Sequence, residues 1–232
     1  MLEEKHPFYV IKRILLCVET AIKLSKLWMV FVFFFIKPAV KETQDKGRAK
    51  NGMFVAVPNS IKNQIIDVSP VFWRIQAVVL TCKHSKILII NSYFPVDKRT
   101  VNVHDVNELL ETLEAIKHTI EVNEFNDILF LGDINADFLR NSNHCNQVSN
   151  FLEEFQLNKS WDNFEIDFTM CHEINEQFQV ATLDHFFWNQ NLEDKVLDAG
   201  VIHSPNNFSD HSPIYCFINE DIPGSSLIIC SS

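Results

Sequence analysis

The chain has 232 residues, of which 47% are hydrophobic, and it contains 5 Gly and 8 Pro. This composition suits one domain with a sizeable core plus an odd terminus, and it excludes a low-complexity protein. The formal net charge of −10 is unevenly distributed, because residues 1–62 carry 11 Lys and Arg against 5 Asp and Glu, whereas residues 63–232 carry 9 against 25. An acidic body does not attract nucleic acid at long range, but a cluster of carboxylates can hold a divalent cation that binds phosphate.

The cysteines are scattered along the chain, with no C-x-x-C pair and no dense framework. The spacing therefore predicts a reduced compartment and no zinc site. The six positions are Cys17, Cys82, Cys145, Cys171, Cys216 and Cys230.

The N-terminal region differs from the rest. Residues 27–36 form an apolar run of ten, about half of what a helix needs to cross a bilayer. Three interpretations stay open: a membrane anchor or uncleaved signal, a buried strand or helix, and a segment unrelated to the domain. The basic stretch that follows favours a solvated linker over a phosphate contact. We therefore expect an atypical segment at 1–45, a domain at 46–219 and a tail at 220–232.

After Gly52 the pattern becomes regular. Residues 53–57, 72–81 and 86–93 are β-rich, and the polar residues 82–85 between the last two runs predict an antiparallel hairpin. The period then changes to three and four, which predicts a helix of about five turns, with Asn102 as its cap. The inward face of this helix is expected to consist of Val103, Val106, Leu110, Leu113, Ile116 and Ile120.

A buried strand ending at Gly132 is expected to follow that helix. A second amphipathic helix is expected around Val148, Phe151, Leu152 and Phe155. Many short strands with two interleaved helices predict a layered α/β protein with mixed or antiparallel sheets. The further β-like runs are residues 164–171, 180–188, 196–202 and 213–218.

Four groups of polar residues lie at or near predicted strand ends. Tyr93 precedes a Pro, Asp133 and Asn135 follow the central strand, Asp184 lies in a strand, and Asp210 with His211 precedes the last one. Each alone has an ordinary explanation: a packed ring, a turn, a buried carboxylate or an Asx turn. Their common placement at strand ends favours a catalytic site.

These residues give the chain a resemblance to the endonuclease/exonuclease/phosphatase superfamily, which is deoxyribonuclease I-like. The resemblance covers about residues 50–218, and it is strongest to the endonuclease domains of non-LTR retrotransposons. It implies a four-layered α/β sandwich of two stacked mixed sheets flanked by helices. The matching motifs are Gly52 to Val57, Asn91 to Pro95, Gly132-Asp133-Ile134-Asn135 and Ser209-Asp210-His211-Ser212-Pro213-Ile214.

The resemblance also implies a phosphodiester hydrolase that uses Mg²⁺, with Mn²⁺ as the alternative. Such cleavage needs an activated water, a cation and donors aimed at the phosphate oxygens. The choice of Asp133 or His211 as general base stays open. The resemblance implies that Asp133 orients the water, that Asn135 donates a hydrogen bond to the phosphate, and that Tyr93 donates one to the phosphate or to the leaving oxygen. It further implies that Asp210 ligates the metal, that His211 contacts the phosphate, and that Asp184 bonds the other ring nitrogen of His211.

One part of the family pattern is not matched. Family members open with a strand ending in Asn and a second ending in Gln-Glu, whose Glu is a principal metal ligand. The only remote candidate considered is Glu42, which follows Pro38 closely. We therefore interpret the domain as N-terminally incomplete, which predicts weak activity.

The four matched motifs favour an enzyme, whereas the unmatched Gln-Glu motif favours an inactive protein, so two classes of function stay open. The first is a DNA endonuclease of retrotransposon origin, intracellular and nuclear if it acts on DNA, with lipid-phosphate hydrolysis as a rival within the class. The second is a catalytically inactive remnant or nucleic-acid-binding protein. DNA is the expected substrate, and neither a stable protein partner nor membrane association is expected.

Overall fold

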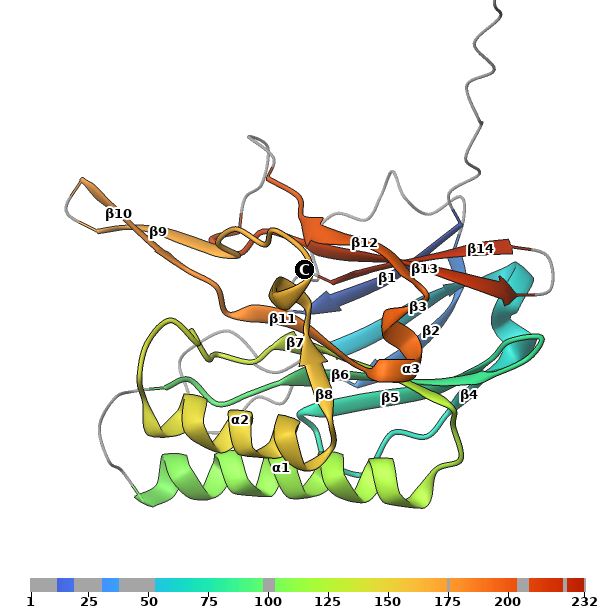
Figure 1. Ribbon diagram of the computed structural model, residues 1–232, viewed down its shortest axis with the longest axis horizontal. Helices are drawn as coiled ribbons and strands as arrows, with labels where there is room; N and C mark the ends of the chain where they lie inside the picture. The colour runs from blue at the N-terminus through green and yellow to red at the C-terminus, as the bar shows by residue number, and fades with distance from the viewer. Residues whose placement is uncertain are drawn as a thin grey trace, which may run out of the picture.

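The computed structural model describes residues 12–18, 31–37, 53–97, 103–174, 176–203, 209–222 and 225–231. Two six-stranded sheets stack face to face, and two long helices cover the outer face of one of them (Figure 1). We call the sheet that carries the helices the helix-side sheet and the other the opposite sheet. A two-stranded hairpin projects to one side of the stack.

The helix-side sheet has the strand order β4-β5-β6-β7-β11-β8, in which β6 and β7 are parallel and the other pairs antiparallel. The predicted hairpin of two strands around residues 82–85 is confirmed as β5 and β6. The strands are β4 Ile65–Asp67, β5 Ile75–Thr81, β6 Lys86–Tyr93, β7 Asp127–Asp133, β8 Leu157–Lys159 and β11 Asp184–Asn189.

The opposite sheet has the order β12-β13-β14-β1-β3-β2, in which β1 and β14 are parallel. Three of its strands come from the ranges 1–45 and 220–232, and they pair with β3 and β13; the domain boundaries stay a prediction. Most of the apolar run 27–36 is strand β2. The strands are β1 Lys12–Val18, β2 Phe31–Lys37, β3 Met53–Pro58, β12 Val196–Val201, β13 Ile214–Ile222 and β14 Ser225–Ser231.

The remaining elements connect or cover these sheets. The β-like run predicted at 164–171 is mostly wrong, because a strand begins only at Met170, and the run at 180–188 divides into the ends of two strands. In the described part of the chain, no helix is both long enough and apolar enough to cross a membrane. These elements are η2 Asn59–Gln64, α1 Val103–Val122, α2 Asn143–Glu154, η3 Ser160–Asp162, β9 Met170–Ile174, β10 Gln177–Ala181 and α3 Gln190–Glu193.

Helix α1 confirms the predicted five turns but corrects its inward face. Leu113, Ile116 and Ile120 are buried as expected, whereas Leu110 is 44% exposed and Leu109 is buried instead. Leu109 continues the four-three-four spacing that keeps side chains on one face, while Leu110 is turned by about 100°. The predicted cap lies outside the described residues.

Helix α2 forms where the second amphipathic pattern predicted it. Val148, Phe151 and Leu152 are buried against the sheet. The Ser142 side chain caps the helix, because its Oγ accepts the backbone N–H of Cys145 at 3.1 Å.

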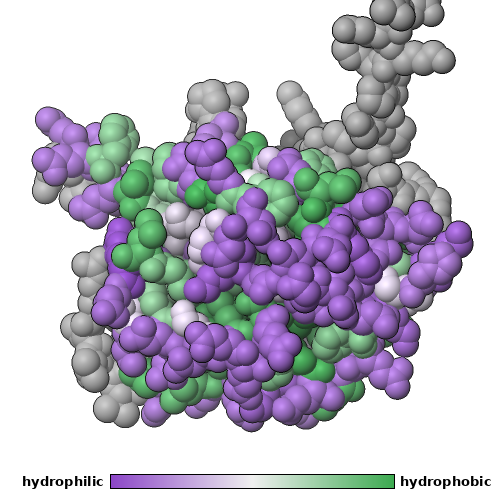
Figure 2. Space-filling view, viewed as in Figure 1, coloured by the Kyte–Doolittle hydropathy of each residue, from purple (hydrophilic) through white to green (hydrophobic). Residues whose placement is uncertain are grey.

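The two faces of the helix-side sheet explain its continuous apolar strands. In β7, Leu129 and Leu131 enter the core between the sheets, whereas Ile128 and Phe130 enter the core under the helices. Three of the four expected layers are thus seen in the described residues: helices, sheet and sheet. Hydrophilic side chains cover much of the face in Figure 2, and hydrophobic ones form smaller patches, in agreement with this inward burial.

Candidate active site

Three neighbouring strands of the helix-side sheet end side by side, and each carries one of the predicted residues. Tyr93 at the end of β6 pairs with Asp133 at the end of β7, and Asp133 pairs with Asp184 at the start of β11. Residues that are far apart in the sequence therefore form one row at a single edge. This is the arrangement that strand-end placement predicted.

Gly132 allows β7 to approach β6 closely at this edge. Its φ is +135°, and a Cβ at this position would lie 1.9 Å from the backbone oxygen of Ser92. Any other residue would therefore be strained and would push the two strands apart. The Gly of Gly-Asp-x-Asn is needed for the spacing between Tyr93 and Asp133.

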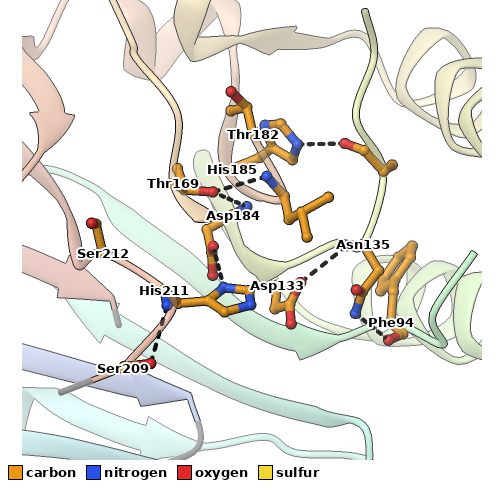
Figure 3. A network of polar contacts seen from close by, with 12 residues as sticks. Phe94, Asp133, Asn135, Thr169, Thr182, Asp184, His185, Ser209, His211 and Ser212 are labelled. Atoms are coloured by element: carbon orange, nitrogen blue, oxygen red, sulfur yellow. Dashed lines mark hydrogen bonds and ion pairs between the residues drawn. The ribbon is translucent and has the colours of Figure 1, made fainter. Parts of the chain in front are cut away.

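Asn135 completes a tight turn after Asp133. Asn135 has a φ of 51°, and its backbone N–H donates to Asp133 Oδ1 at 3.1 Å. Its side-chain Nδ2 donates to the carbonyl oxygen of Phe94 at 2.9 Å, and the Phe94 N–H donates to the carbonyl oxygen of Asp133 at 2.8 Å. The N–H of Asn135 thus orients the carboxylate of Asp133, while Phe94 holds the Asp133 backbone (Figure 3).

His211 approaches the row from the loop before β13. Its Nδ1 lies 2.8 Å from Asp184 Oδ2, which is the pairing that the sequence analysis expects. The ligand atoms of Asp133, Asp184 and His211 all lie within 4.8 Å of one another, and Figure 3 shows the three side chains converging. We call these three residues the carboxylate–histidine cluster.

The charge of His211 is set by its neighbours. Burial lowers its pKa, but the hydrogen bond and charge of Asp184, with further contributions from Asp133 and Asp210, outweigh burial and raise the pKa to about 9. The imidazole therefore carries a positive charge at neutral pH, and its Nδ1–H donates to Asp184. A positive group held by a buried carboxylate is suited to binding a phosphate.

The adjacent histidine behaves in the opposite way. His185 is 2% exposed, and burial lowers its pKa to about 4. It is therefore neutral at pH 7, and its Nε2–H donates to the carbonyl oxygen of Ala136 at 2.7 Å. This contact supports the loop that follows Asp133, so that His185 has a structural part in the site.

Thr169 is a site residue that the sequence analysis missed. Its fully buried Oγ1 accepts the backbone N–H groups of Leu183 at 2.8 Å and Asp184 at 3.0 Å. Its carbonyl oxygen accepts the N–H of Ser212 at 2.6 Å, next to His211. Thr169 thus joins the two halves of the Asp184–His211 pair, and no local motif marks it in the sequence.

Besides Asn135, two further predicted residues lie outside the carboxylate–histidine cluster. Asp210 is exposed, and its Oδ2 lies 4.0 Å from His172 Nδ1. Tyr93 is half-buried, and the guanidinium carbon of Arg74 lies 5.6 Å from the centre of its ring. The roles assigned to all six predicted residues stay predictions.

The opposite sheet brings the end of β1 to the same edge as His211. Ile214, three residues after His211, pairs with Ser231 of β14, and Ser231 pairs with Leu16 of β1. Strand β1 ends two residues later at Val18, and the next residue in the sequence is Glu19. The sequence analysis considered only Glu42 as a candidate glutamate, because the run 12–18 was not expected to be a strand; Glu19 itself lies outside the described residues.

Comparisons with solved structures define the fold. No protein-family model matches the sequence, and no curated protein matches it. The architecture is nevertheless that of the endonuclease/exonuclease/phosphatase fold, as the sequence analysis predicted.

Three solved structures illustrate the likeness. The endonuclease domain of TRAS1, a telomere-specific non-LTR retrotransposon, has a TM-score of 0.64 and 16% identity, with 89% of this chain and 98% of that one covered. A 3'-5' exonuclease from Neisseria meningitidis has a TM-score of 0.60 and 15% identity, covering 84% and 82%. An AP endonuclease from Archaeoglobus fulgidus has a TM-score of 0.56 and 15% identity, covering 80% and 79%. At these identities the likeness concerns the fold.

Proposed function

We propose that the chain is a Mg²⁺-dependent phosphodiester hydrolase that nicks DNA, of retrotransposon origin. The observation that carries the proposal is the carboxylate–histidine cluster, in which the Asp184–His211 pair faces Asp133 at the strand ends. The similar structures named above are two endonucleases and an exonuclease by their titles, and a Neisseria 3' phosphatase with a TM-score of 0.56 was solved with a product DNA hairpin. These titles favour DNA over a lipid phosphodiester.

In the proposed reaction, Asp133 accepts a proton from the attacking water. Its carboxylate is already oriented by the N–H of Asn135. The charged His211 binds a phosphate oxygen, and Asp184 holds the imidazole and stabilises its charge. Asn135 uses one amide N–H on Phe94, and we assign its other N–H to the phosphate. Tyr93 remains as a hydrogen-bond donor to the phosphate or to the oxygen that leaves when the P–O bond breaks.

The donor set fits a hard divalent cation. Asp133 and Asp184 offer carboxylate oxygens, which Mg²⁺ prefers, whereas a protonated His211 is not a ligand. A complete site therefore needs further carboxylates, for which we propose Asp210 and Glu19. When bound, the cation would neutralise developing charge on the phosphate.

Glu19 replaces Glu42 as our candidate for the strand-end glutamate. The register described above brings Val18, the residue before it, to the edge where β13 begins. With Glu19 as a ligand, the absence of a Gln-Glu motif no longer implies an inactive protein. The inactive alternative then becomes an outcome of the experiments.

A plasmid-nicking assay tests the proposal. The purified chain is incubated with supercoiled plasmid and Mg²⁺, beside Asp133→Ala and His211→Ala. Controls are Asp221→Ala, an exposed carboxylate at the far end of β13, and His118→Ala, exposed on α1. We expect nicking that needs Mg²⁺, is lost in the first two variants and persists in the controls. If the chain does not nick the plasmid, or if neither substitution affects nicking, the proposal is wrong.

A paired substitution tests the metal ligand separately. Glu19→Gln should raise the Mg²⁺ concentration needed for half-maximal nicking by at least about tenfold, since a lost ligand weakens the cation site. Glu42→Gln should leave the Mg²⁺ dependence unchanged. The reverse result would restore Glu42 as the candidate.

A further inference from the structure

Arg74 is a buried cation beside the proposed active site to which no role is yet assigned. It directly precedes β5 and is only 6% exposed. Its guanidinium carbon lies 4.0 Å from the centre of the Trp73 ring and 5.6 Å from that of Tyr93. The guanidinium is therefore within cation–π range of both rings.

The contacts of Arg74 converge on Tyr93 and its neighbour. Arg74 Nη1 donates to the carbonyl oxygen of Tyr93 at 3.2 Å, and the N–H of Tyr93 donates to the carbonyl oxygen of Arg74 at 3.0 Å. The hydroxyl of Ser92 donates to the same Arg74 oxygen at 3.1 Å. Arg74 thus holds both the N–H and the carbonyl oxygen of Tyr93, and its guanidinium contacts the Tyr93 ring.

A second contact anchors Arg74 to the helix layer. Its Nη2 lies 2.9 Å from Oε1 of Glu108 on α1, whose side chain is 33% exposed. Its Nε is buried, with no hydrogen-bond partner in the described part of the chain. A buried cation with an unmet donor costs stability compared with an apolar side chain of similar volume. Packing alone therefore does not explain an arginine here.

We propose that Arg74 is a positioning residue that fixes Tyr93 against Asp133. This inference rests on the proposed function for the part that concerns catalysis. Tyr93 pairs with Asp133, and the next residue, Phe94, bonds both Asp133 and Asn135. A shift of Tyr93 would therefore spread to the water-activating and phosphate-binding groups, where small displacements cost rate.

A double-mutant comparison tests whether Arg74 acts through Tyr93. Arg74→Met should lower the kcat of nicking about tenfold with little change in KM, because the geometry and not the affinity is disturbed. In a Tyr93→Phe background the same substitution should lower kcat less than in the wild type, because the part of the loss that passes through the Tyr93 hydroxyl has already occurred. The control Lys117→Met on α1 removes an ion pair with Glu154 of α2 at the surface and should leave kcat unchanged. Equal losses in both backgrounds would overturn the inference.

Fluorine NMR tests the same contact without activity. The chain has 3 tyrosines, so that 3-fluorotyrosine labelling gives a simple spectrum in which Tyr93→Phe assigns its resonance. Arg74→Met should shift or broaden the Tyr93 resonance and leave that of Tyr215 in β13 unchanged. An unmoved Tyr93 resonance would overturn the inference even if the wild-type chain nicks DNA. A chain that does not nick but shows the shift would contradict the proposed function alone.

A milder pair of variants covers the case in which Arg74→Met does not fold. Glu108→Gln removes the ion pair but keeps the arginine, and Arg74→Lys keeps the charge but not the two-sided contact. Both should move the Tyr93 resonance from its wild-type position, and Arg74→Lys should retain only part of the wild-type kcat. Full activity and an unmoved Tyr93 resonance in Arg74→Lys would contradict a role for the guanidinium.

Discussion

Strand β7 carries a buried aspartate at each end, and the two ends differ in their partners. Asp127, at the start of β7, is 1% exposed, and its Oδ2 lies 2.7 Å from Lys195 Nζ. The same Nζ lies 2.5 Å from Glu220 Oε1. Asp133, at the other end, is 6% exposed and lies beside Asp184 and His211.

The difference separates a carboxylate that joins the two sheets from one that lies in the proposed active site. The Asp127 end joins the two sheets, because Glu220 belongs to β13 of the opposite sheet and Lys195 lies between both carboxylates. At the Asp133 end two carboxylates also share one cation, but that cation is an imidazolium, and the three ligand atoms lie within 4.8 Å of one another in an arrangement that could hold a metal ion. The two ends are roughly 20 Å apart along the strand. The chemistry and the inter-sheet ion pairs can therefore be changed independently.

The largest expected effect is on activity at the Asp133 end. Asp133→Asn keeps the shape but removes the proton acceptor, so nicking should fall by about 10³-fold. The free energy of unfolding should change by less than about 1 kcal/mol, because one of two neighbouring carboxylates is removed. Nicking rates and urea unfolding measure both quantities. A large loss of stability with normal nicking would reverse the comparison.

The next effect is on stability at the Asp127 end. Lys195→Met leaves two buried carboxylates without their cation, and it should lower the free energy of unfolding by about 3 kcal/mol. The nicking rate of the folded protein should stay within about twofold. The control Lys83→Met, which removes an exposed pair with Asp221 at 3.8 Å, should cost less than about 0.5 kcal/mol. Equal losses in the two lysine variants would show that the buried pair does not hold the sheets.

The smallest effect is a pH dependence at the site end. Burial lowers the pKa of His185 in the folded chain to about 4, against an ordinary 6.5. Between pH 6.5 and pH 4, His185 is therefore protonated in the unfolded chain but neutral in the folded chain. Stability should therefore fall as pH decreases, by about 2 kcal/mol at pH 5 from this group. In His185→Phe, which lacks the bond to Ala136, stability should be lower at pH 7 but should fall less between pH 7 and 5. Parallel curves for both proteins, measured by urea unfolding, would contradict the buried neutral histidine.

The sequence pattern correctly predicted the elements whose conformation depends on residues close together in the chain. The apolar run of β7, the periods of α1 and α2, and the polar residues at strand ends are short-range signals. The choice between Leu109 and Leu110 on α1 was wrong, since both fit an apolar stripe and only the sheet decides between them. Thr169 was missed because its contacts to Leu183 and Ser212 depend on chain segments that the sequence does not bring together.

The N-terminal strands show the same limit at a larger scale. Strand β1 owes its place to partners at both ends of the chain, so its own seven residues gave no signal that a central strand was present. For this reason Glu19 was overlooked, although it directly follows β1. Long-range pairing, which a single sequence does not display, therefore determines both the opposite sheet and our proposed metal ligand.

The position of β14 has a consequence for the order in which the chain folds. The helix-side sheet and both long helices are contained in residues 65–189, so this half can assemble as soon as that segment leaves the ribosome. The opposite sheet has β14 between β13 and β1, with Leu227 paired to Lys12 across about 200 residues. It can close only after β14 has been synthesised, and such distant pairings form slowly. Until then β1 lacks its partner β14, and a nascent chain must keep that edge of β1 from pairing with other chains.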